Sequence, residues 1–402
     1  MRHQLLQQIE KGSKNALMKK RIITHYINHG NSTITDLANE LELSIPTVTK
    51  FITEMTEEGF INDYGKLETS GGRHPSLYGL NPESGYFIGV EIKRDTVNIA
   101  LINFKGDLVN SKMDIQYHYE NNNEASLDLL TQIISDYISE LNIDADKILN
   151  INVSVSGRVD SEKGLSYSSY SFDKLPLAEI LSSRLNLDVT IDNDTRSMAF
   201  GEYMKGVVDG EKNIIYINLS WGIAISIIIN GKLYTGKSGF SGEFGHISAF
   251  DNEIICHCGK KGCLETEASG LAFHRKLMER INSGENSILS DKVKAGENVS
   301  LDDLVDATKR EDMLCIEIVE EIGAELGKQI AGLINIFNPE LVIIAGTLSE
   351  TGDYITQPII TSVRKYSLNL VNKDSKIKTS TLQYKAGVIG SCMMARSRVF
   401  DF

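Results

Sequence analysis

The chain has 402 residues, more than one ordinary hydrophobic core accommodates, so its length predicts two or three domains. Its hydrophobic share of 41% and charged share of 24% are typical of a soluble globular protein, and no apolar run approaches the length of a membrane span. The N-terminal residues lack the apolar core of a signal peptide, so we expect a cytoplasmic protein with no membrane partner. The net charge of −13 argues, at first sight, against a nucleic-acid partner.

The acidic excess, however, is confined to one part of the chain. Residues 1–80 contain nine basic and nine acidic side chains, whereas the residues after position 80 contain 32 basic and 45 acidic ones. The N-terminal segment is therefore a separate electrostatic unit of zero net charge, and it can bind DNA if its basic side chains share one face.

Three short helices are predicted in this N-terminal segment. Apolar residues recur at helical spacing over residues 14–30, and the pattern Thr33-x-x-Asp36 is typical of a helix start. The third helix begins at Ser44, a natural N-cap, and continues to Gly59 with apolar residues on one side. Side chains off this apolar stripe, in the N-terminal half of the helix, have the position that contacts bases and phosphates in a recognition helix. The DNA-contacting residues predicted there are Ser44, Thr47, Thr49 and Lys50, beside Ile45.

The residues that follow predict the wing of a winged helix-turn-helix. Residues 60–61 and 66–67 have strand character, and the tight-turn sequence 62–65 separates them. The loop 70–75 then presents Arg73, which predicts a contact with a minor groove or a phosphate. A three-helix interaction domain without a DNA role is the alternative interpretation of the same pattern.

An Asn-Pro-Glu-Ser-Gly linker begins at residue 81, and the alternating strand and helix patterns after it predict an α/β domain. Two of the predicted core strands run into polar turns, at Ser156-Gly157 and at Asn193-Asp194. A carboxylate at the end of a strand can take the proton of a ligand hydroxyl or hold that hydroxyl. The alternative is that one of these two residues, or the preceding aspartate, only caps the helix that follows.

A metal site is predicted within residues 239–269, where three of the chain's five cysteines lie with two histidines and four glutamates. The predicted ligand set is His246-x9-Cys256-x-Cys258-x4-Cys263. One imidazole and three thiolates satisfy tetrahedral Zn²⁺ and leave no open position, so this zinc is expected to be structural. His257 is an alternative nitrogen ligand, and free buried cysteines beside a surface histidine are the other interpretation. Clustered cysteines also fit a reducing compartment.

Two runs in this segment extend the metal pattern: Gly242-Glu243-x-Gly245-His246 and Cys256-x-Cys258-Gly259-x-x-Gly262-Cys263-Leu264-Glu265. They resemble the zinc signature of the ROK family, which comprises bacterial sugar kinases and sugar-responsive repressors of the NagC/XylR type. The resemblance extends over nearly the whole chain. It implies an α/β fold in which a winged helix-turn-helix, residues 1–80, precedes a two-lobed actin-like (ribonuclease H-like) sugar-binding domain, residues 81–402. The lobes are expected at about 81–195 with the C-terminal helix, and at 196–385.

The same resemblance implies which residues line a sugar pocket. In the family, acceptors at these positions surround the vicinal hydroxyls of a pyranose, and the zinc-bound histidine contacts the sugar through its second nitrogen. The implied sugar-binding residues are Ser156, Gly157, Asn193, Asp194, Glu243, His246 and Glu265. Zinc is then expected to organise the pocket without acting as an electrophile. For Glu265 taken alone, a solvated helix residue is the alternative.

Two turns depart from the pattern of the kinases in the family. Kinases carry Asp-x-Gly-x-Thr at the first phosphate turn, where this chain runs from Glu91 to Asp95 with Lys93 at the glycine position. At the second phosphate loop, Trp221 and Ala224 replace small or glycine residues. The missing glycines block a close approach of the backbone to a phosphate, so we expect no catalytic residues and no kinase activity.

The combined hypothesis is a sugar-responsive transcriptional repressor. A homodimer or homotetramer would place two recognition helices on a palindromic double-stranded operator of carbohydrate genes, and a sugar or sugar phosphate would release it. An ATP-dependent ROK sugar kinase with a fused DNA-binding domain is the second interpretation, which Asp194 supports and Lys93 and Trp221 oppose. A third is a domain that acts through a protein partner and has a vestigial sugar pocket, which the intact Glu243 and Glu265 oppose.

Overall fold

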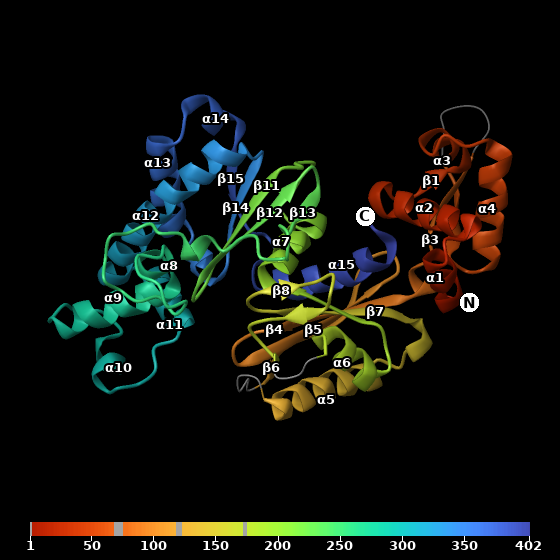
Figure 1. The fold of residues 1–402 in the computed structure, drawn as a ribbon. Coiled ribbons are helices and arrows are strands. Elements are labelled where there is room, and N and C mark those ends of the chain that lie inside the picture. Colours follow the sequence, from red (N-terminus) through yellow and green to blue (C-terminus); the bar gives the residue numbers. More distant parts are fainter. Residues whose placement is uncertain (1, 68–74, 118–122, 172–174) are drawn as a thin grey trace. The chain divides into compact units, whose positions relative to one another are not determined.

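The structure is a computed structural model that describes residues 2–67, 75–117, 123–171 and 175–402 (Figure 1). Contacts within the chain divide it into two compact units. Unit 1 comprises residues 1–197 and 388–402, and unit 2 comprises residues 198–387. The division falls inside helix α7 (Asp194–Lys205) and at the start of helix α15 (Ala386–Phe400). Among the described residues, no helix has the length and apolar character needed to cross a bilayer.

The N-terminal segment of unit 1 is helical as predicted, with one helix more in its described residues. The helices are α1 (Arg2–Glu10), α2 (Lys14–His29), α3 (Ile34–Glu40) and α4 (Ile45–Glu57). Both predicted caps are present: Thr33 Oγ1 accepts a hydrogen bond from the Asp36 amide at 3.2 Å, and Ser44 Oγ accepts one from the Thr47 amide at 3.3 Å. The apolar stripe of α4 is buried, whereas Leu17 in α2 is 45% exposed.

The prediction for the wing is wrong in its strand boundaries. The strands are β1 (Ser32–Thr33), β2 (Ile61–Lys66) and β3 (Ser76–Leu80), and β3 pairs antiparallel with both others. Residues 62–65 therefore continue β2 and form no turn. The register shifts between Asp63 and Lys66, and Gly65 has φ +93°, so the glycine accommodates an irregularity within the strand. The predicted DNA contact Arg73 lies outside the described residues.

The described strands of the rest of unit 1 form a five-stranded sheet of order β10-β7-β4-β5-β6. Their bounds are β4 (Tyr86–Ile92), β5 (Thr96–Asn103), β6 (Leu108–Gln116), β7 (Ile148–Val155) and β10 (Val189–Asn193). β4, β5 and β6 form an antiparallel meander, whereas β7 and β10 run parallel to β4. The carboxyl ends of β4, β7 and β10 consequently lie at one edge, with Glu91 opposite Ser154 and Asn193 opposite Val155. Ligands of open α/β sheets bind at such an edge.

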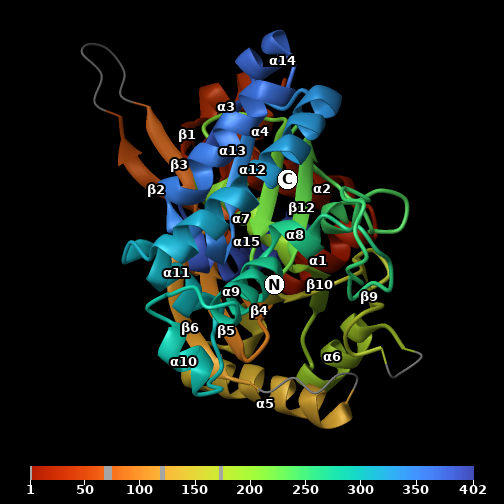
Figure 2. The ribbon, with the colours of Figure 1, turned by 90° about the vertical axis from the view of Figure 1, so that its left-hand side faces the viewer.

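Helices cover both faces of this sheet: α5 (Glu124–Glu140) lies on one side and α15 on the other (Figures 1 and 2). α6 (Leu177–Leu185) contributes Leu181 to the same apolar core as α5. α15 approaches β4 so closely that a Cβ built on Gly89 would lie 2.3 Å from the Cys392 amide nitrogen. Only glycine fits there, so the sequence itself provides for the packing of the last helix directly on the central strand. Short elements complete the unit: β8 (Val159–Asp160), β9 (Leu165–Ser166), η1 (Pro82–Ser84) and η2 (Ala145–Lys147).

The described strands of unit 2 form a second five-stranded sheet, of order β13-β12-β11-β14-β15. Their bounds are β11 (Ile214–Leu219), β12 (Ile223–Ile229), β13 (Lys232–Tyr234), β14 (Leu341–Ala345) and β15 (Lys376–Thr379). β11, β12 and β13 are antiparallel neighbours, and β14 and β15 run parallel to β11. The two sheets thus share one pattern of strand order and direction.

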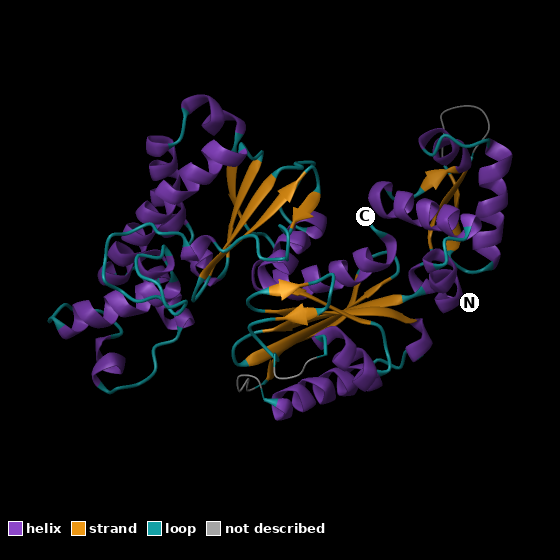
Figure 3. Cartoon of the chain, viewed as in Figure 1, coloured by secondary structure: helices purple, strands orange, loops and turns teal. Residues whose placement is uncertain are grey.

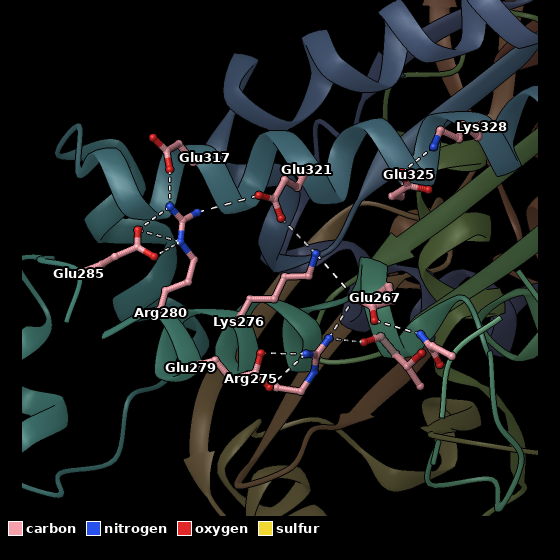
Figure 4. A network of polar contacts seen from close by, with 12 residues as sticks. Glu267, Arg275, Lys276, Glu279, Arg280, Glu285, Glu317, Glu321, Glu325 and Lys328 are labelled. Carbon is pink, nitrogen blue, oxygen red and sulfur yellow. Dashed lines mark hydrogen bonds and ion pairs between the residues drawn. The ribbon is translucent and has the colours of Figure 1, made fainter. Parts of the chain in front are cut away.

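Helices also cover the unit 2 sheet (Figure 3). They are α8 (Glu265–Ala268), α9 (Gly270–Asn282), α10 (Ser290–Lys294), α11 (Leu301–Lys309), α12 (Met313–Phe337), α13 (Asp353–Tyr366) and α14 (Asn369–Asp374), with η3 (Phe244–His246), η4 (Thr347–Thr351) and η5 (Gln383–Lys385). α9 and α12 bury Phe273 and Ile322 against one face, and Ala199 of α7 packs with Tyr216 on the other. Exposed ion pairs join α9 to α12, among them Arg280 with Glu317 (Figure 4).

Candidate functional site

Four of the predicted sugar-binding residues gather at the carboxyl edge of the unit 1 sheet. Ser156, just after β7, donates a hydrogen bond from Oγ to Asp194 Oδ2 at 2.5 Å. Asn193 Nδ2 donates to the Gly157 carbonyl oxygen and to Asp194 Oδ1, both at 2.9 Å. The two polar turns that the sequence separates by 35 residues are therefore one cluster, because β7 and β10 are adjacent parallel strands.

The cluster also explains why a helix cap was a reasonable alternative. Asn193 Oδ1 accepts a hydrogen bond from the Arg196 amide at 3.1 Å, so this side chain does cap α7. Asp194 Oδ1 accepts one from the Thr195 amide at 2.7 Å, whereas Oδ2 receives only the Ser156 hydroxyl among the bonds found in the described residues. Burial raises the pKa of Asp194, and the bond from Ser156 opposes this shift. Its Oδ2 retains capacity for a further donor.

The first departure from the kinase pattern is also at this edge. Glu91, near the end of β4, is buried and accepts a hydrogen bond from Asn98 Nδ2 at 2.8 Å, and burial raises its pKa. The next turn is closed by a bond from the Lys93 amide to the Thr96 carbonyl at 2.9 Å. Lys93 therefore lies in a tight hairpin turn, and its amide is already hydrogen-bonded within that turn.

The predicted DNA-contacting residues form an exposed surface on the first turns of α4. Ser44, Thr49 and Lys50 are exposed and Thr47 is half-buried. The Ser44 and Thr47 hydroxyls bond to one another at 2.8 Å. The Lys50 side chain is 68% exposed with its amine 3.8 Å from Glu54, a distance at which an exposed pair contributes little. Its amine is therefore available to a phosphate.

In unit 2, the predicted metal ligands converge. One donor atom from each of His246, Cys256, Cys258 and Cys263 lies within 4.8 Å of the others. Cys256 Sγ is 3.5 Å from His246 Nδ1, and Cys258 Sγ is 3.6 Å from Cys263 Sγ. Tetrahedral zinc with bonds of about 2.3 Å to sulfur and 2.0–2.1 Å to nitrogen separates its ligands by roughly 3.5–3.8 Å. The donor set and its spacing fit such an ion.

The two ring nitrogens of His246 face different groups. Nδ1 points to the cysteine cluster, and Nε2 lies 3.8 Å from Glu243 Oε2. His257, the alternative ligand, is instead 2.8 Å from Glu265 Oε1 through Nδ1 and 3.8 Å from Cys256 Sγ. His246, His257 and Glu265 form a second, overlapping group of possible ligands. The geometry favours His246 as the nitrogen member of the cysteine cluster.

Glu265 is a buried residue, contrary to the alternative of a solvated helix position. It is 5% exposed, and Oε2 accepts a hydrogen bond from the Ile223 amide at 3.1 Å. A Cβ built on Gly222 would lie 2.5 Å from the same oxygen. Gly222, the glycine that remains in the second kinase-like loop, is therefore required to make room for the Glu265 carboxylate.

Sequence reasoning missed the ion pairs of Asp192, a buried residue next to the strand-end cluster. Asp192 is 3% exposed, and its Oδ1 accepts hydrogen bonds from Arg196 Nε at 2.6 Å and from the Asn193 amide at 2.7 Å. Its Oδ2 lies 3.4 Å from Arg398 Nη2, on the last turn of α15. The i,i+4 spacing to Arg196 was a possible signal. Arg398, the partner 206 residues away, had no recognisable signal in the sequence.

The fold and the site define a winged helix-turn-helix followed by an actin-like α/β domain of the sugar-kinase type. A family model described as "ROK family" matches residues 87–398, and one described as "Winged helix-turn-helix DNA-binding" matches residues 18–62. The chain belongs to the ROK family. The predicted family is thereby confirmed, as is the predicted winged helix-turn-helix followed by an actin-like α/β domain.

Similar proteins include both repressors and kinases. The chain is 29% identical to a xylose repressor of Caldicellulosiruptor bescii, covering 100% of this chain and 98% of that protein. It is 28% identical to a glucokinase of Halalkalibacterium halodurans, covering 78% of this chain and 96% of the kinase. Among solved structures, a ROK family transcriptional regulator described as a homolog of the E. coli MLC protein aligns with a TM-score of 0.81 and 26% identity, covering 95% of this chain and 96% of that one.

Proposed function

We propose that the chain is a transcriptional repressor of carbohydrate genes that binds operator DNA through α4 and is released by a sugar or sugar phosphate. The observation that carries the proposal is the pairing, on one chain, of an exposed recognition surface on α4 with a ROK domain whose strand-end cluster has acceptor capacity left. The similarity to a named xylose repressor over the full length of both chains supports it.

The DNA-binding half of the proposal rests on the length of α4 and on the exposed side chains of its first turns. α4 has 13 residues, and its first turns present Ser44, Thr47, Thr49 and Lys50 away from the buried stripe. A helix of this size enters the major groove and places such side chains near base edges and phosphates. We assign Lys50 to a phosphate contact, and Arg73, which lies outside the described residues, to the adjacent groove or backbone.

The sugar-binding half rests on hydrogen-bond acceptors. The residues proposed to bind sugar hydroxyls are Ser156, Gly157, Asn193 and Asp194 in unit 1, and Glu243, His246 and Glu265 in unit 2. Fixed acceptors read hydroxyl stereochemistry, because a sugar that lacks the matching hydroxyl leaves a buried group without its hydrogen bond. The sugars named in its relatives, xylose and glucose, define the first compounds to test.

The metal is proposed to be a structural zinc held by His246, Cys256, Cys258 and Cys263. Zinc at this site would fix the orientation of the His246 ring and of the loop that carries Glu243. With the Nδ1 atom committed to the metal cluster, the Nε2 atom of His246 is the one that can contact a sugar hydroxyl.

We propose that the protein has no kinase activity. Lys93 in a closed hairpin turn and Trp221 in the second loop leave no glycine backbone for phosphates at these positions. A residual ROK sugar kinase is the second candidate, because Asp194 has the acceptor geometry for a sugar hydroxyl and a glucokinase is among the relatives. Incubation with ATP and aldoses separates the two, since only a kinase consumes ATP.

The proposed assembly is a homodimer or homotetramer in which residues 1–80 serve as the DNA-binding domain and residues 81–402 as the sugar-binding domain. Two copies of α4 then read two half-sites of a palindromic operator in double-stranded DNA. A protein that binds operator DNA acts in the cytoplasm, where the bacterial chromosome is located.

The experiment is fluorescence anisotropy of the full chain on duplex DNA from upstream of its own gene, titrated with xylose, glucose and N-acetylglucosamine, free and phosphorylated. Sequence-selective binding that one sugar weakens is the expected result. Lys50→Ala should weaken operator binding on the order of fivefold and lower the salt slope by about 1, while Lys147→Ala, a control on the sugar-binding lobe, changes neither. Absence of selective binding at low salt would contradict the proposed function.

A further inference from the structure

The last helix connects the strand-end cluster of unit 1 to the winged helix-turn-helix. Its middle is fixed on the sheet: Gly89 admits the backbone of α15, and Ser391 Oγ donates a hydrogen bond to the Val90 carbonyl at 3.2 Å. Ser154 Oγ bonds both to Ser391 and, at 2.6 Å, to Ser197 of α7. These buried hydroxyls tie α15 to the strands that end at the cluster.

The last turn of α15 contacts Asp192, which precedes Asn193 and Asp194, through Arg398. Arg398, whose side chain is 34% exposed, lies 3.4 Å from Asp192 Oδ2. Asp192 in turn accepts the Asn193 amide and the Arg196 guanidinium, so its position fixes the backbone that carries Asn193 and Asp194. A ligand that pulls on this strand end consequently changes the geometry offered to Arg398.

The same turn contacts the DNA-binding side through α2. Thr24 Oγ1 donates a hydrogen bond to the Phe400 carbonyl at 3.0 Å, and Lys20 Nζ lies 2.6 Å from Asp401 Oδ2. The Phe400 ring is buried, 5.4 Å from the ring of Phe104, which in turn is 6.0 Å from Phe60 at the end of the α4 segment. Helix α2 therefore contacts the end of α15 directly, and Phe104 lies between Phe400 and Phe60, which follows α4.

This end of the helix also holds a buried guanidinium, Arg396, for which no ion pair closer than 4 Å is found in the described residues. Arg396 is 2% exposed, stacks at 5.4 Å on the Phe402 ring, and has Nε and Nη2 atoms with no hydrogen-bond partner among the described residues. Burial lowers its pKa to about 10. A buried guanidinium with unsatisfied N–H groups carries a free-energy cost, which attraction to Asp107 only partly offsets.

We propose that the C-terminal turn, residues 396–402, is the coupling element through which sugar occupancy alters the DNA-binding helices. The Asp192–Arg398 pair is its contact with the sugar side, and the contacts of Thr24 and Lys20 are its contacts with α2. The inference rests on the proposed function, and it makes Arg398 a positioning residue that touches neither ligand. Removing the pair should uncouple two binding events that each remain intact.

The test uses the full chain with Arg398→Gln, with Arg398→Lys as a charge-preserving variant and Arg184→Gln as the matched control. Arg184 is a partly exposed arginine of unit 1 that pairs with Asp128 and Glu124, far along the chain from α15. Operator affinity is measured without sugar and with saturating xylose, glucose or N-acetylglucosamine, free and phosphorylated, and sugar affinity is measured by calorimetry.

In Arg398→Gln, the sugar affinity and the sugar-free operator affinity should stay within about threefold of wild type, while the sugar-induced weakening of operator binding falls by at least about fivefold. Arg398→Lys should retain more of that weakening, and Arg184→Gln all of it. Full coupling in Arg398→Gln, or a loss of either binding event by itself, overturns the inference.

A failure of the proposed function is visible separately, as a wild-type chain that binds no operator or no sugar. In that case the hydrogen exchange of α2 decides the inference, because the proposal requires α2 to respond to the Asp192–Arg398 pair. Arg398→Gln should then accelerate exchange in α2 and in residues 396–402 relative to Arg184→Gln. Unchanged exchange in α2 overturns it.

Discussion

The two five-stranded sheets have the same strand order and directions, yet two carboxylates of helix α7, one in each unit, have different hydrogen-bond environments. In unit 1, Asp194 begins the helix after β10, and its Oδ2 receives one bond within the described residues, from Ser156. In unit 2, Glu202 is fully buried, and donors of the described chain fill both its oxygens. These donors are the Ser380 hydroxyl, the Leu382 amide, the Val207 amide and the Thr381 hydroxyl.

The difference teaches how to separate a structural carboxylate from a binding one on the same scaffold. A carboxylate whose lone pairs are all taken by its own chain stabilises the fold and has nothing to offer a ligand. A partly exposed carboxylate with an open acceptor position can accept a hydrogen bond from another molecule. Sheet topology alone does not distinguish the two, since both units have the same strand order and only the hydrogen-bond partners of each carboxylate differ.

The largest effect is expected from removing the histidine–cysteine cluster, which the described residues contain in unit 2 alone. Cys258→Ser should release zinc and lower the unfolding free energy of unit 2 by on the order of 5 kcal/mol or more, because metal binding is coupled to folding of the loop. Sugar affinity should fall with it, since His246 and Glu243 lose their support. Metal analysis and thermal unfolding measure both effects.

The control for this variant is Cys315→Ser, which changes a buried cysteine of α12 outside the cluster. It should keep one zinc per chain even if it loses some stability. A wild-type protein that contains no zinc, or a Cys258→Ser protein that keeps it, contradicts the assignment of the ligands.

The structural carboxylate should give the next largest effect. Glu202→Gln replaces an acceptor by an amide whose nitrogen faces backbone donors, and burying such a mismatch costs about 2–4 kcal/mol. Urea unfolding followed by circular dichroism measures the loss. Sugar affinity of the protein that remains folded should be near wild type, so a variant that folds normally and fails to bind sugar would show that Glu202 is part of the sugar site.

The sequence predicted the parts of both units that depend on local patterns. Apolar spacing and caps predicted α2, α3 and α4, and the spacing of one histidine and three cysteines predicted the donor cluster, because ligands within a short loop converge whatever the rest of the chain does. The prediction of the wing strands was wrong, because a glycine between polar residues has the composition of a turn. Only the pairing with residues 76–80 shows that Gly65 is an irregularity within a strand.

Contacts between residues far apart in the chain could not be predicted from the sequence, for a physical reason. Asp192 and Arg398, or Glu202 and Ser380, meet only after the sheets have formed, so neither member carries a local signal of the other. The strand-end residues Asn193 and Asp194 could be predicted as a pair by resemblance to a family. Their connection to the end of α15 could be recognised only from the packing of that helix on β4.

The binding carboxylate should change affinity and leave stability nearly unaffected. Asp194→Asn should weaken sugar binding by about 10–100-fold, because the open position of the carboxylate oxygen is lost or reversed in polarity. Fluorescence of Trp221, the only tryptophan of the chain, or calorimetry measures the affinity. The operator affinity of the sugar-free protein serves as the internal control and should not change.

The pH dependence sharpens this prediction. Burial raises the pKa of Asp194, and only the ionised carboxylate accepts from a sugar hydroxyl at both oxygens. Wild-type affinity should therefore decline, as the pH is lowered, at a higher pH than the ordinary aspartate pKa of about 3.9 would give. Asp194→Asn should lack this decline, and an identical pH profile in both proteins would contradict the role of Asp194.

The smallest effect is expected at the charged surface of unit 2, which contrasts with the buried Asp192–Arg196 pair of unit 1. Arg280 lies 2.5 Å from Glu317 and 2.6 Å from Glu285, but its side chain is 28% exposed (Figure 4). Water and salt screen such pairs, so Arg280→Met should lower stability by less than about 1 kcal/mol, and the difference should shrink at high salt. Arg310→Met, at a more exposed arginine, is the control with no expected change. A loss as large as that of Glu202→Gln, independent of salt, would mean that the helices α9 and α12 depend on this network as the sheet depends on its buried carboxylate.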